Sequence, residues 1–387
     1  MKKSGIVKQA VADLVSRAHQ EVDQGLLPSC QIALAMDNEI VHFQTIGKTV
    51  AGDATRYVVF SASKAIVSAA FWQLIGEGRK IRLTDRVADH LPEFGTNGKD
   101  AVTIEQLLTH QGGFPRSTMM PPAWDTVESR MEEYAKWTLQ FKPGSKFEYH
   151  ITSAHWVQAD ILGRLDKLDY REAIRRRISV ALGLKSIRLG VPEAEQKDIA
   201  TPKLVGEPPT KEEFMAALGI PGIDVGEAID AHLAAMGESF VLERGVPGGN
   251  AVATAADFAL FFQALLHNPG GHWDAALLPE FTMGIRAKGP DLLRGGPPAN
   301  RSLGGLLVAG SDKLAHLRGL GYAVGPRAFG HDGAGGQTAL TDPDTGLTFV
   351  YLTDAIDRHL LRQWKRIRSI ATRGAQCAEG APKKAAA

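Results

Sequence analysis

Apolar and polar positions alternate along the first sixty residues in blocks that predict a helix followed by strands. Residues 1–21 carry apolar side chains at helical spacing, interrupted by charged residues, which predicts an amphipathic helix. Residues 29–47 read as two strands around Asp37-Asn38, a dipeptide that favours a tight hairpin turn. The apolar run 56–60 predicts a third strand, which leads directly into a helix.

The middle of the chain has mainly helical patterns. Residues 65–78 are apolar nearly all round the helical projection, which predicts a buried helix that ends at the glycines of "GEG". Residues 103–115 predict a helix that ends at Gly112-Gly113. In 253–266, Thr254 and Asp257 have the spacing of a helix cap before an apolar run, whereas 190–250 is punctuated by Pro and Gly and supports no firm assignment.

The last part of the chain returns to strands and closes with a helix. The predicted strands are 320–325, 328–333, 337–343 and 347–354, and the predicted helix is 358–371. The Ala- and Lys-rich residues after Arg373 predict a frayed tail.

This order of elements predicts an α+β fold. Two separate sheets would fit the pattern, but we favour one antiparallel sheet built from both chain ends, flanked by helices, with a largely helical insertion. The corresponding domains are 1–62 with 305–373 for the sheet, 63–304 for the helical part, and 374–387 for a flexible tail.

Composition narrows the possible partners. The 387 residues are 44% hydrophobic and carry a net charge of +1, and no basic run interleaves with aromatic residues, so we expect no nucleic-acid partner. No stretch approaches the roughly 20 apolar residues of a membrane span, and the N-terminus lacks the apolar core of a signal peptide, so we expect no membrane partner. Cys30 and Cys377 read as free thiols, which points to a reducing, cytoplasmic location. The oligomeric state is not readable from the sequence.

Ser61 and Lys64 stand at the start of the buried helix. Residues three apart share a helix face, so both side chains can enter one cavity. A lysine in an apolar site loses its proton more easily and can then accept the serine proton. A capping serine followed by a surface lysine is the simpler interpretation of this spacing alone. The absence of any other charge from Ala65 to Ile75 favours a functional pair.

Three ordered motifs give the chain a family resemblance. They are "SASK" with Ser61 and Lys64, "PGSKFEYHI" with Tyr149, and "GHDGAGG" with His331 and Gly333. Together with supporting stretches over residues 8–365, they resemble the serine β-lactamase and penicillin-binding-protein superfamily, and more narrowly the class C β-lactamase-like esterases called family VIII carboxylesterases.

The resemblance implies a serine hydrolase with a β-lactamase-like fold and no cofactor. Ser61 would carry the acyl group, and Lys64 would accept or relay its proton. A free phenol is a poor base at neutral pH, but beside an ammonium its phenolate is favoured, so Tyr149 and Lys64 would share one proton. The resemblance further implies that the backbone N–H groups of Ser61 and Ala334 bind the oxyanion, with His331 and Gly333 at the substrate.

Two positions depart from the family pattern. Ile151 replaces the asparagine of the second motif, and His331 replaces the lysine of the third. Both changes remove polar contacts that β-lactams use, so we expect a preference for neutral esters, unless His150 or another polar residue substitutes. A β-lactamase, a D-amino-acid peptidase or amide hydrolase, and an acyltransferase remain alternatives that use the same site.

Other candidate residues receive structural interpretations. We read His110 as a helix-end residue and Asp332 as a surface or strand-end residue, and His150 and His155 lack metal-ligand spacing, so no metal site is predicted. A non-enzymatic binding module would not need all three catalytic candidates. An α/β-hydrolase is excluded because no G-x-S-x-G elbow occurs in the sequence. The aromatic residues expected to contribute to substrate selectivity are Phe114 and Trp124.

Overall fold

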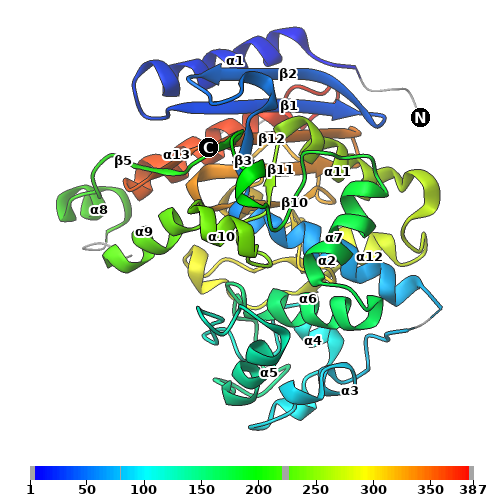
Figure 1. Ribbon diagram of the computed structural model, residues 1–387. Coiled ribbons are helices and arrows are strands. Elements are labelled where there is room, and N and C mark those ends of the chain that lie inside the picture. The colour runs from blue at the N-terminus through cyan, green and yellow to red at the C-terminus, as the bar shows by residue number, and fades with distance from the viewer. Residues whose placement is uncertain (1–4, 79, 220–225, 383–387) are drawn as a thin grey trace.

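A single eight-stranded antiparallel sheet forms the centre of the molecule (Figure 1). The computed structural model describes residues 5–78, 80–219 and 226–382. In spatial order the strands are β2 (Glu39–Gly47), β1 (Ser29–Met36), β12 (Leu347–Thr353), β11 (Gln337–Asp342), β10 (Phe329–Gly333), β9 (Leu307–Val308), β8 (Arg301–Ser302) and β7 (Ile285–Ala287). The sheet therefore takes its strands from both ends of the chain, and the predicted α+β fold with a helical insertion is confirmed.

The hairpin at the start of the chain forms where the sequence predicts it. Asp37 and Asn38 both adopt left-handed φ angles, 52° and 63°, as a two-residue turn between β1 and β2 requires. All eight residues of β1 are buried, because helices cover both faces of the sheet.

The two faces of the sheet bury different helices. Ile32 and Leu34 pack on one face with α1 (Lys8–Asp23) and α13 (Leu360–Ala375). Their neighbours Ala33 and Ala35 point to the other face, which α11 (Ala255–His267) covers. Figure 1 shows α1 next to β2 and β1 at the top of the view, and α3, α4, α5 and α6, which lie within residues 87–166, at the opposite end of the molecule.

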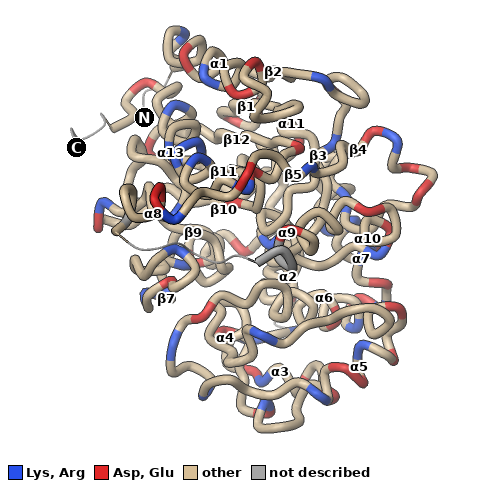
Figure 2. The backbone as a smooth tube through the Cα atoms, turned by 90° about the vertical axis from the view of Figure 1, so that its left-hand side faces the viewer, with Lys and Arg blue, Asp and Glu red and all other residues tan. Residues whose placement is uncertain are grey.

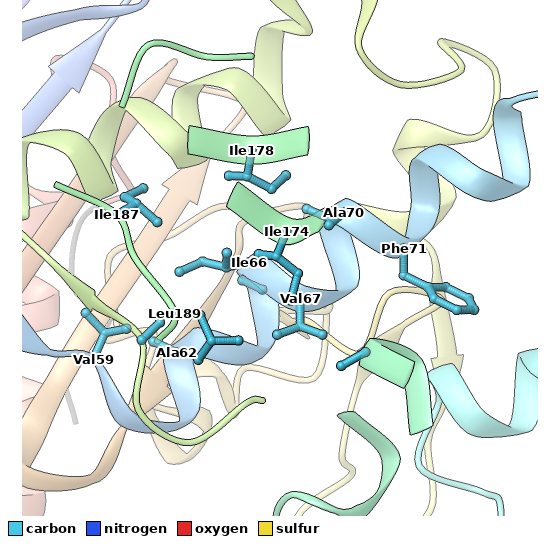
Figure 3. Packing of buried hydrophobic residues seen from close by; sticks show 14 of the residues in the cluster. Val59, Ala62, Ile66, Val67, Ala70, Phe71, Ile174, Ile178, Ile187 and Leu189 are labelled. Atoms are coloured by element: carbon cyan, nitrogen blue, oxygen red, sulfur yellow. The ribbon is translucent and has the colours of Figure 1, made fainter. Parts of the chain in front are cut away.

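The helix α2 (Ser63–Gly76) runs through the middle of the main hydrophobic core. Residues 63–75 are all buried, which is the reason for the apolar pattern round the whole helix. In Figure 3, Ile66, Val67 and Ala70 of this helix pack among Ile174, Ile178 and Leu189. A core this dense holds the start of α2 in a fixed position relative to the sheet.

The insertion contains most of the other helices. They are α3 (Val87–His90), α4 (Ile104–Leu108), α5 (Val127–Lys136), α6 (Ser153–Asp166), α7 (Tyr170–Ile174), α8 (Lys211–Leu218), α9 (Gly226–Ala235), α10 (Ser239–Arg244) and α12 (Leu278–Thr282). The region 190–250, which the sequence leaves unassigned, supplies α8, α9 and α10. It also supplies β4 (Ile199–Ala200) and β5 (Lys203–Val205), and β5 pairs in parallel with β13 (Ala355–Asp357).

A small three-stranded sheet prepares the position of Ser61. The strand β3 (Arg56–Val58) pairs with β4 in parallel and with β6 (Val252–Ala253) in antiparallel fashion. The backbone N–H of Val59 continues this pairing by donating to the carbonyl of Ala251 at 2.9 Å. The segment just before β6 is thereby held beside the turn that precedes α2.

Two of the predicted elements differ in the structure. Helix α4 ends at Leu108 and not at Gly112-Gly113, because His110 adopts a left-handed φ of 57°. Residues 320–325 form no strand, since Gly321 has a φ of 77° and lies against the backbone of Thr372, where a side chain would not fit.

The chain after Arg373 is ordered and not frayed through Ala378. Cys377 and Ala378 are buried, and Ala378 pairs with Ile6 near the other end of the chain. Figure 2 shows the two termini on the same side of the molecule, with acidic and basic residues intermixed along the tube. Cys30 and Cys377 are both free thiols, as predicted.

Candidate active site

Ser61 lies in a strained turn between a strand and a helix. Phe60, directly before it, has a left-handed φ of 45°, which is unfavourable for an aromatic residue and is typical of functional turns. The Ser63 hydroxyl donates to the carbonyl of Phe60 and accepts the N–H of Ala251 at 3.0 Å. These bonds fix the turn, so that the partly exposed Ser61 faces a large cleft.

Lys64 is buried one helical turn after Ser61. Its Nζ donates to the Ser61 Oγ at 3.3 Å and to the carbonyl oxygen of Gly248 at 2.7 Å. Gly248 has a φ of 72°, and a Cβ there would lie 3.0 Å from Cγ of Lys64, so only glycine brings this carbonyl so close. Burial lowers the pKa of Lys64, which favours the neutral amine that can accept a proton.

Tyr149 enters the same site from the segment between α5 and α6. Its ring centre lies 5.0 Å from Nζ of Lys64. Ser61 and Tyr149 line the same cleft. The structure therefore brings together the serine, the lysine and the phenol that the first two sequence motifs single out.

His110 holds Tyr149 in place from behind. The His110 carbonyl accepts the N–H of Glu148 at 3.2 Å, and its Nδ1 accepts the N–H of His150 at 3.1 Å. The His110 ring then stacks on the Tyr149 ring with centroids 4.9 Å apart. The residue follows the end of α4, as predicted, and its contacts clamp the backbone on both sides of Tyr149.

The third motif forms the opposite wall of the site. Gly333 ends β10 directly beside the turn of Ser61, and a Cβ on Gly333 would lie 2.5 Å from the carbonyl oxygen of Val59. Gly333 and Ala334 both line the cleft next to Ser61. The backbone of β10 approaches the nucleophile this closely because position 333 has no side chain.

His331 does not reach the cleft. Its side chain is 1% exposed, its Nδ1 donates to the Asp332 carbonyl at 2.6 Å, and its Nε2 accepts from Arg301 at 3.1 Å. Burial, followed by the nearby charges of Arg301 and Lys64, lowers the pKa of His331 well below its ordinary value. With both nitrogens engaged inside the protein, the neutral imidazole cannot contact substrate as the sequence suggests.

Asp332 is not an ordinary surface or strand-end residue. Its carboxylate forms an ion pair with Arg294 at 2.7 Å, and Nε of Arg294 lies 3.4 Å from a second carboxylate, that of Asp291. Asp332 and Arg294 both line the cleft. The cleft wall beside Gly333 thus carries a cation whose charge is offset by carboxylates.

Ile151 places an apolar side chain at the cleft where the family pattern has an asparagine. Its side chain lines the cleft and is 57% exposed. His150 cannot substitute, because it is buried, its Nδ1 bonds the Glu148 carbonyl at 2.7 Å and its Nε2 accepts the N–H of Phe114 at 3.2 Å. Burial lowers the pKa of His150 to about 4, so it stays neutral.

Two residues of the site escaped the sequence analysis. Gly248 stands in a "PGG" turn, and only its contact with Lys64 distinguishes it from the many other glycines. Arg301 lies between Asn300 and Ser302, a polar context that reads as surface, yet its side chain is fully buried beside Tyr149. Neither position carries a local signal, because the sheet topology alone brings each one to the site.

The cleft has a volume of about 1910 Å³ and an apolar mouth. Leu292 and Leu293 stand at its edge with 75% and 68% of their surface exposed. Phe114 and Trp124, expected to contribute to selectivity, are instead buried in the main core. Selectivity therefore has to come from other residues that line the cleft.

Neither a metal centre nor a membrane span is found in the part of the chain that the structure describes. There, no group of three or more His, Cys, Asp and Glu side chains is placed to hold a metal ion. None of the helices in the described ranges combines the length and hydropathy needed to cross a bilayer.

Comparison with known proteins shows the family of the chain. Residues 9–371 match the family described as Beta-lactamase. The esterase/beta-lactamase LipL of Mycobacterium tuberculosis is 27% identical over 306 residues, which cover 76% of this chain and 67% of LipL.

Solved structures show the same fold. A penicillin-binding protein homolog from Caulobacter crescentus superposes with a TM-score of 0.72 at 25% identity and covers 94% of this chain and 98% of its own. A family VIII carboxylesterase superposes with a TM-score of 0.72 at 22% identity, covering 96% and 99%. Since the family match spans nearly the whole chain and includes all three motifs, the protein belongs to the beta-lactamase family and is a serine hydrolase.

Proposed function

We propose that this protein is a carboxylesterase that cleaves neutral esters through an acyl-enzyme on Ser61. The observation that carries the proposal is the 3.3 Å contact between Nζ of a buried Lys64 and the Ser61 hydroxyl. Burial lowers the pKa of Lys64, so the amine is a base within hydrogen-bond reach of the nucleophile.

In the acylation step, the Ser61 oxygen attacks the ester carbonyl while its proton passes to the Lys64–Tyr149 pair. The backbone N–H groups of Ser61 and Ala334 bind the oxyanion that forms, which requires the close approach of β10 at Gly333. Collapse of this intermediate breaks the bond to the alcohol oxygen. The pair returns the proton to the leaving alcohol through the Tyr149 hydroxyl.

Deacylation repeats these steps with water. A water molecule attacks the acyl-enzyme carbonyl, the Lys64–Tyr149 pair takes one of its protons, and the same pair returns a proton to the Ser61 oxygen. The carboxylic acid leaves and the starting state is restored. Transfer of the acyl group to an alcohol in place of water would need no additional protein group.

The cleft wall favours neutral esters over β-lactams. A β-lactam presents a carboxylate, and Arg294, a cation that lines the cleft, is already paired with Asp332. The apolar Ile151 offers no hydrogen bond to a substrate amide. A polar substrate group that is buried without a hydrogen-bond partner weakens substrate binding, so both features disfavour amide and anionic substrates.

The apolar residues at the mouth favour substrates with an apolar acyl or alcohol group. Ile151, Leu292 and Leu293 line the cleft and expose more than half of their surface. Covering such side chains with an aliphatic or aromatic group removes apolar surface from water. The names of LipL and of the family VIII carboxylesterase support the ester assignment.

A fluorophosphonate probe and a substrate panel test the proposal. We expect stoichiometric labelling of the protein, lost in Ser61→Ala and kept in Ser16→Ala, since Ser16 lines the same cleft away from the lysine. We expect p-nitrophenyl butyrate to be hydrolysed faster than nitrocefin or a D-alanyl anilide. Preference for nitrocefin or for the anilide would replace the esterase by a β-lactamase or an amide hydrolase.

A further inference from the structure

Arg301 is a buried cation at the back of the site. It lies on β8, and its side chain is fully buried. Its Nη1 donates to the Gly305 carbonyl at 3.0 Å and to Nε2 of His331 at 3.1 Å, both of which are neutral acceptors. Among the described residues, no carboxylate forms an ion pair with Arg301, although burying a cation normally requires a nearby negative charge.

The carboxylates closest to Arg301 are already engaged with another cation. Asp332 and Asp291 both lie against Arg294, at 2.7 Å and 3.4 Å. The guanidinium carbon of Arg301 instead lies 5.0 Å from the centre of the Tyr149 ring. Nζ of Lys64 lies at the same distance from that ring centre, so two potential cations flank a single phenol.

We propose that Arg301 is a positioning residue whose fixed positive charge keeps the Lys64–Tyr149 pair in its proton-accepting form. The charge repels a proton on the Lys64 amine and attracts negative charge to the Tyr149 oxygen. Both effects act in the same direction, because each disfavours the fully protonated pair. The inference rests on the proposed function, in which this pair takes the Ser61 proton.

The exchange of lysine for histidine in the third motif fits this role. The family resemblance places a lysine at position 331. The ammonium of such a lysine and the guanidinium of Arg301 would repel each other at hydrogen-bond distance. Nε2 of His331 accepts from Arg301, and its Nδ1–H is used by the Asp332 carbonyl. The positive charge of the third motif has thus moved to Arg301, on β8, while position 331 has become a neutral acceptor for it.

The other titratable groups round the pair do not supply this charge. Burial lowers the pKa of His110, His155 and His331 well below the ordinary value, so all three are neutral at pH 7. Arg294 is balanced by Asp332 and Asp291. Repulsion from Arg301 adds to burial in lowering the pKa of Lys64, in agreement with the proposed direction.

The pH profile of kcat/KM for a p-nitrophenyl ester tests the role. In Arg301→Met we expect the acid limb to move to higher pH by about one unit or more, as expected for a unit charge within a few ångström. At high pH the rate should return close to that of the wild type. Arg301→Lys should keep the limb near its original position, and the double variant Arg301→Met with His331→Lys should move it back.

A purely structural role gives a different pattern. If Arg301→Met lowers kcat/KM equally at every pH, or leaves the acid limb in place, the proposal is wrong. If Arg301→Met does not fold, Arg301→Gln takes its place, because glutamine removes the charge but keeps a hydrogen-bond donor for the Gly305 carbonyl and His331. An acid limb that stays at the wild-type position in Arg301→Gln would contradict the electrostatic role.

A measurement without substrate separates this proposal from the proposed function. The near-ultraviolet absorbance of ionised tyrosine, with Tyr149→Phe as the blank, follows the proton of the pair directly. We expect ionisation at higher pH in Arg301→Met than in Arg301→Lys. If the wild type hydrolyses no ester but this difference appears, the esterase assignment fails while the role of Arg301 stands. If esters are hydrolysed and the difference is absent, the role of Arg301 fails.

Discussion

The carboxylate of Asp332 lies 2.7 Å from the guanidinium of Arg294 in the wall of the cleft, next to the glycine that borders the nucleophile. The pair offsets the positive charge of Arg294. In Asp332→Asn the remaining partner of Arg294 is Asp291 at 3.4 Å, so we expect the more exposed positive charge to lower KM for an ester that carries a carboxylate by about fivefold, which corresponds to about 1 kcal/mol for such an interaction. Steady-state kinetics with a matched neutral ester should show little change.

The matched control is Asp344→Asn, which breaks a pair with Arg327 away from the cleft. This variant should alter neither KM. An equal effect of Asp332→Asn on neutral and anionic esters would show that the pair shapes the wall and does not select by charge.

Restoring the polar residue of the second motif should change the preference between esters and amides. Ile151→Asn places a side-chain amide in the cleft at an exposed position, so its effect on stability should be small. We expect the ratio of kcat/KM for nitrocefin to kcat/KM for the ester to rise by about fivefold to tenfold, which corresponds to the free energy of about one hydrogen bond. Val50→Asn, another exposed apolar position, is the control and should leave the ratio unchanged. An unaltered ratio in Ile151→Asn would remove this position from substrate selection.

Lys64→Met should lower kcat/KM by about 10³-fold, since it removes the base next to Ser61. We expect the melting temperature of Lys64→Met to stay close to that of the wild type, because the buried amine is replaced by an apolar side chain of similar length. Lys99 provides a matched buried lysine outside the site, where its Nζ donates to the Thr96 carbonyl at 2.8 Å. Lys99→Met should keep the rate per folded molecule. Near-normal turnover in Lys64→Met would exclude the lysine from the mechanism.

The buried histidines behind the site predict a loss of stability in mild acid. Burial lowers the pKa of His110, His150, His155 and His331 in the folded state, whereas the unfolded chain keeps values near 6.5. The unfolded state therefore binds more protons as pH falls below about 6.5, and the free energy of unfolding falls with it. For His150, with a pKa of about 4, the loss amounts to about 3 kcal/mol by pH 4.

Urea unfolding between pH 7.5 and 5 measures this slope. His150→Phe should reduce it, since one titrating group is removed, whereas the exposed His19→Gln should not. A stability that stays constant over this range would mean that the buried histidines become protonated without cost.

The sequence predicted the elements whose backbone conformation is determined by neighbouring residues in the chain. The turn at Asp37-Asn38 and the cap of α11, where Thr254 accepts the N–H of Asp257, lie where the residue types place them. It also brought Ser61, Lys64 and Tyr149 to attention through the order of their motifs. These features depend on residues close together in the chain, or on a family pattern.

The remaining features depend on contacts between distant segments. The end of α4 is set by the backbone of His110, which turns so that it can hold Tyr149. Arg301 looks like a surface residue until pairing between β8, β9 and β10 places it behind His331. His331 itself was predicted at the substrate, and only the geometry of the sheet shows that its ring points away from the cleft.

The pairing of β1 with β12 has a consequence for folding of the protein during translation. Cys30 lies opposite Thr353, so the centre of the sheet joins segments that are far apart in the sequence and are synthesised at different times. One edge of the first hairpin stays unpaired until β12 has emerged from the ribosome. Pairing between such distant segments slows folding, and the unpaired edge strand can meanwhile associate with neighbouring chains. A nascent chain interrupted before β12 would carry Ser61, Lys64 and the residues of β10, but without β12 the strand β10 would not be joined to the first hairpin, so enzymatic activity should arise only after β12 has been synthesised.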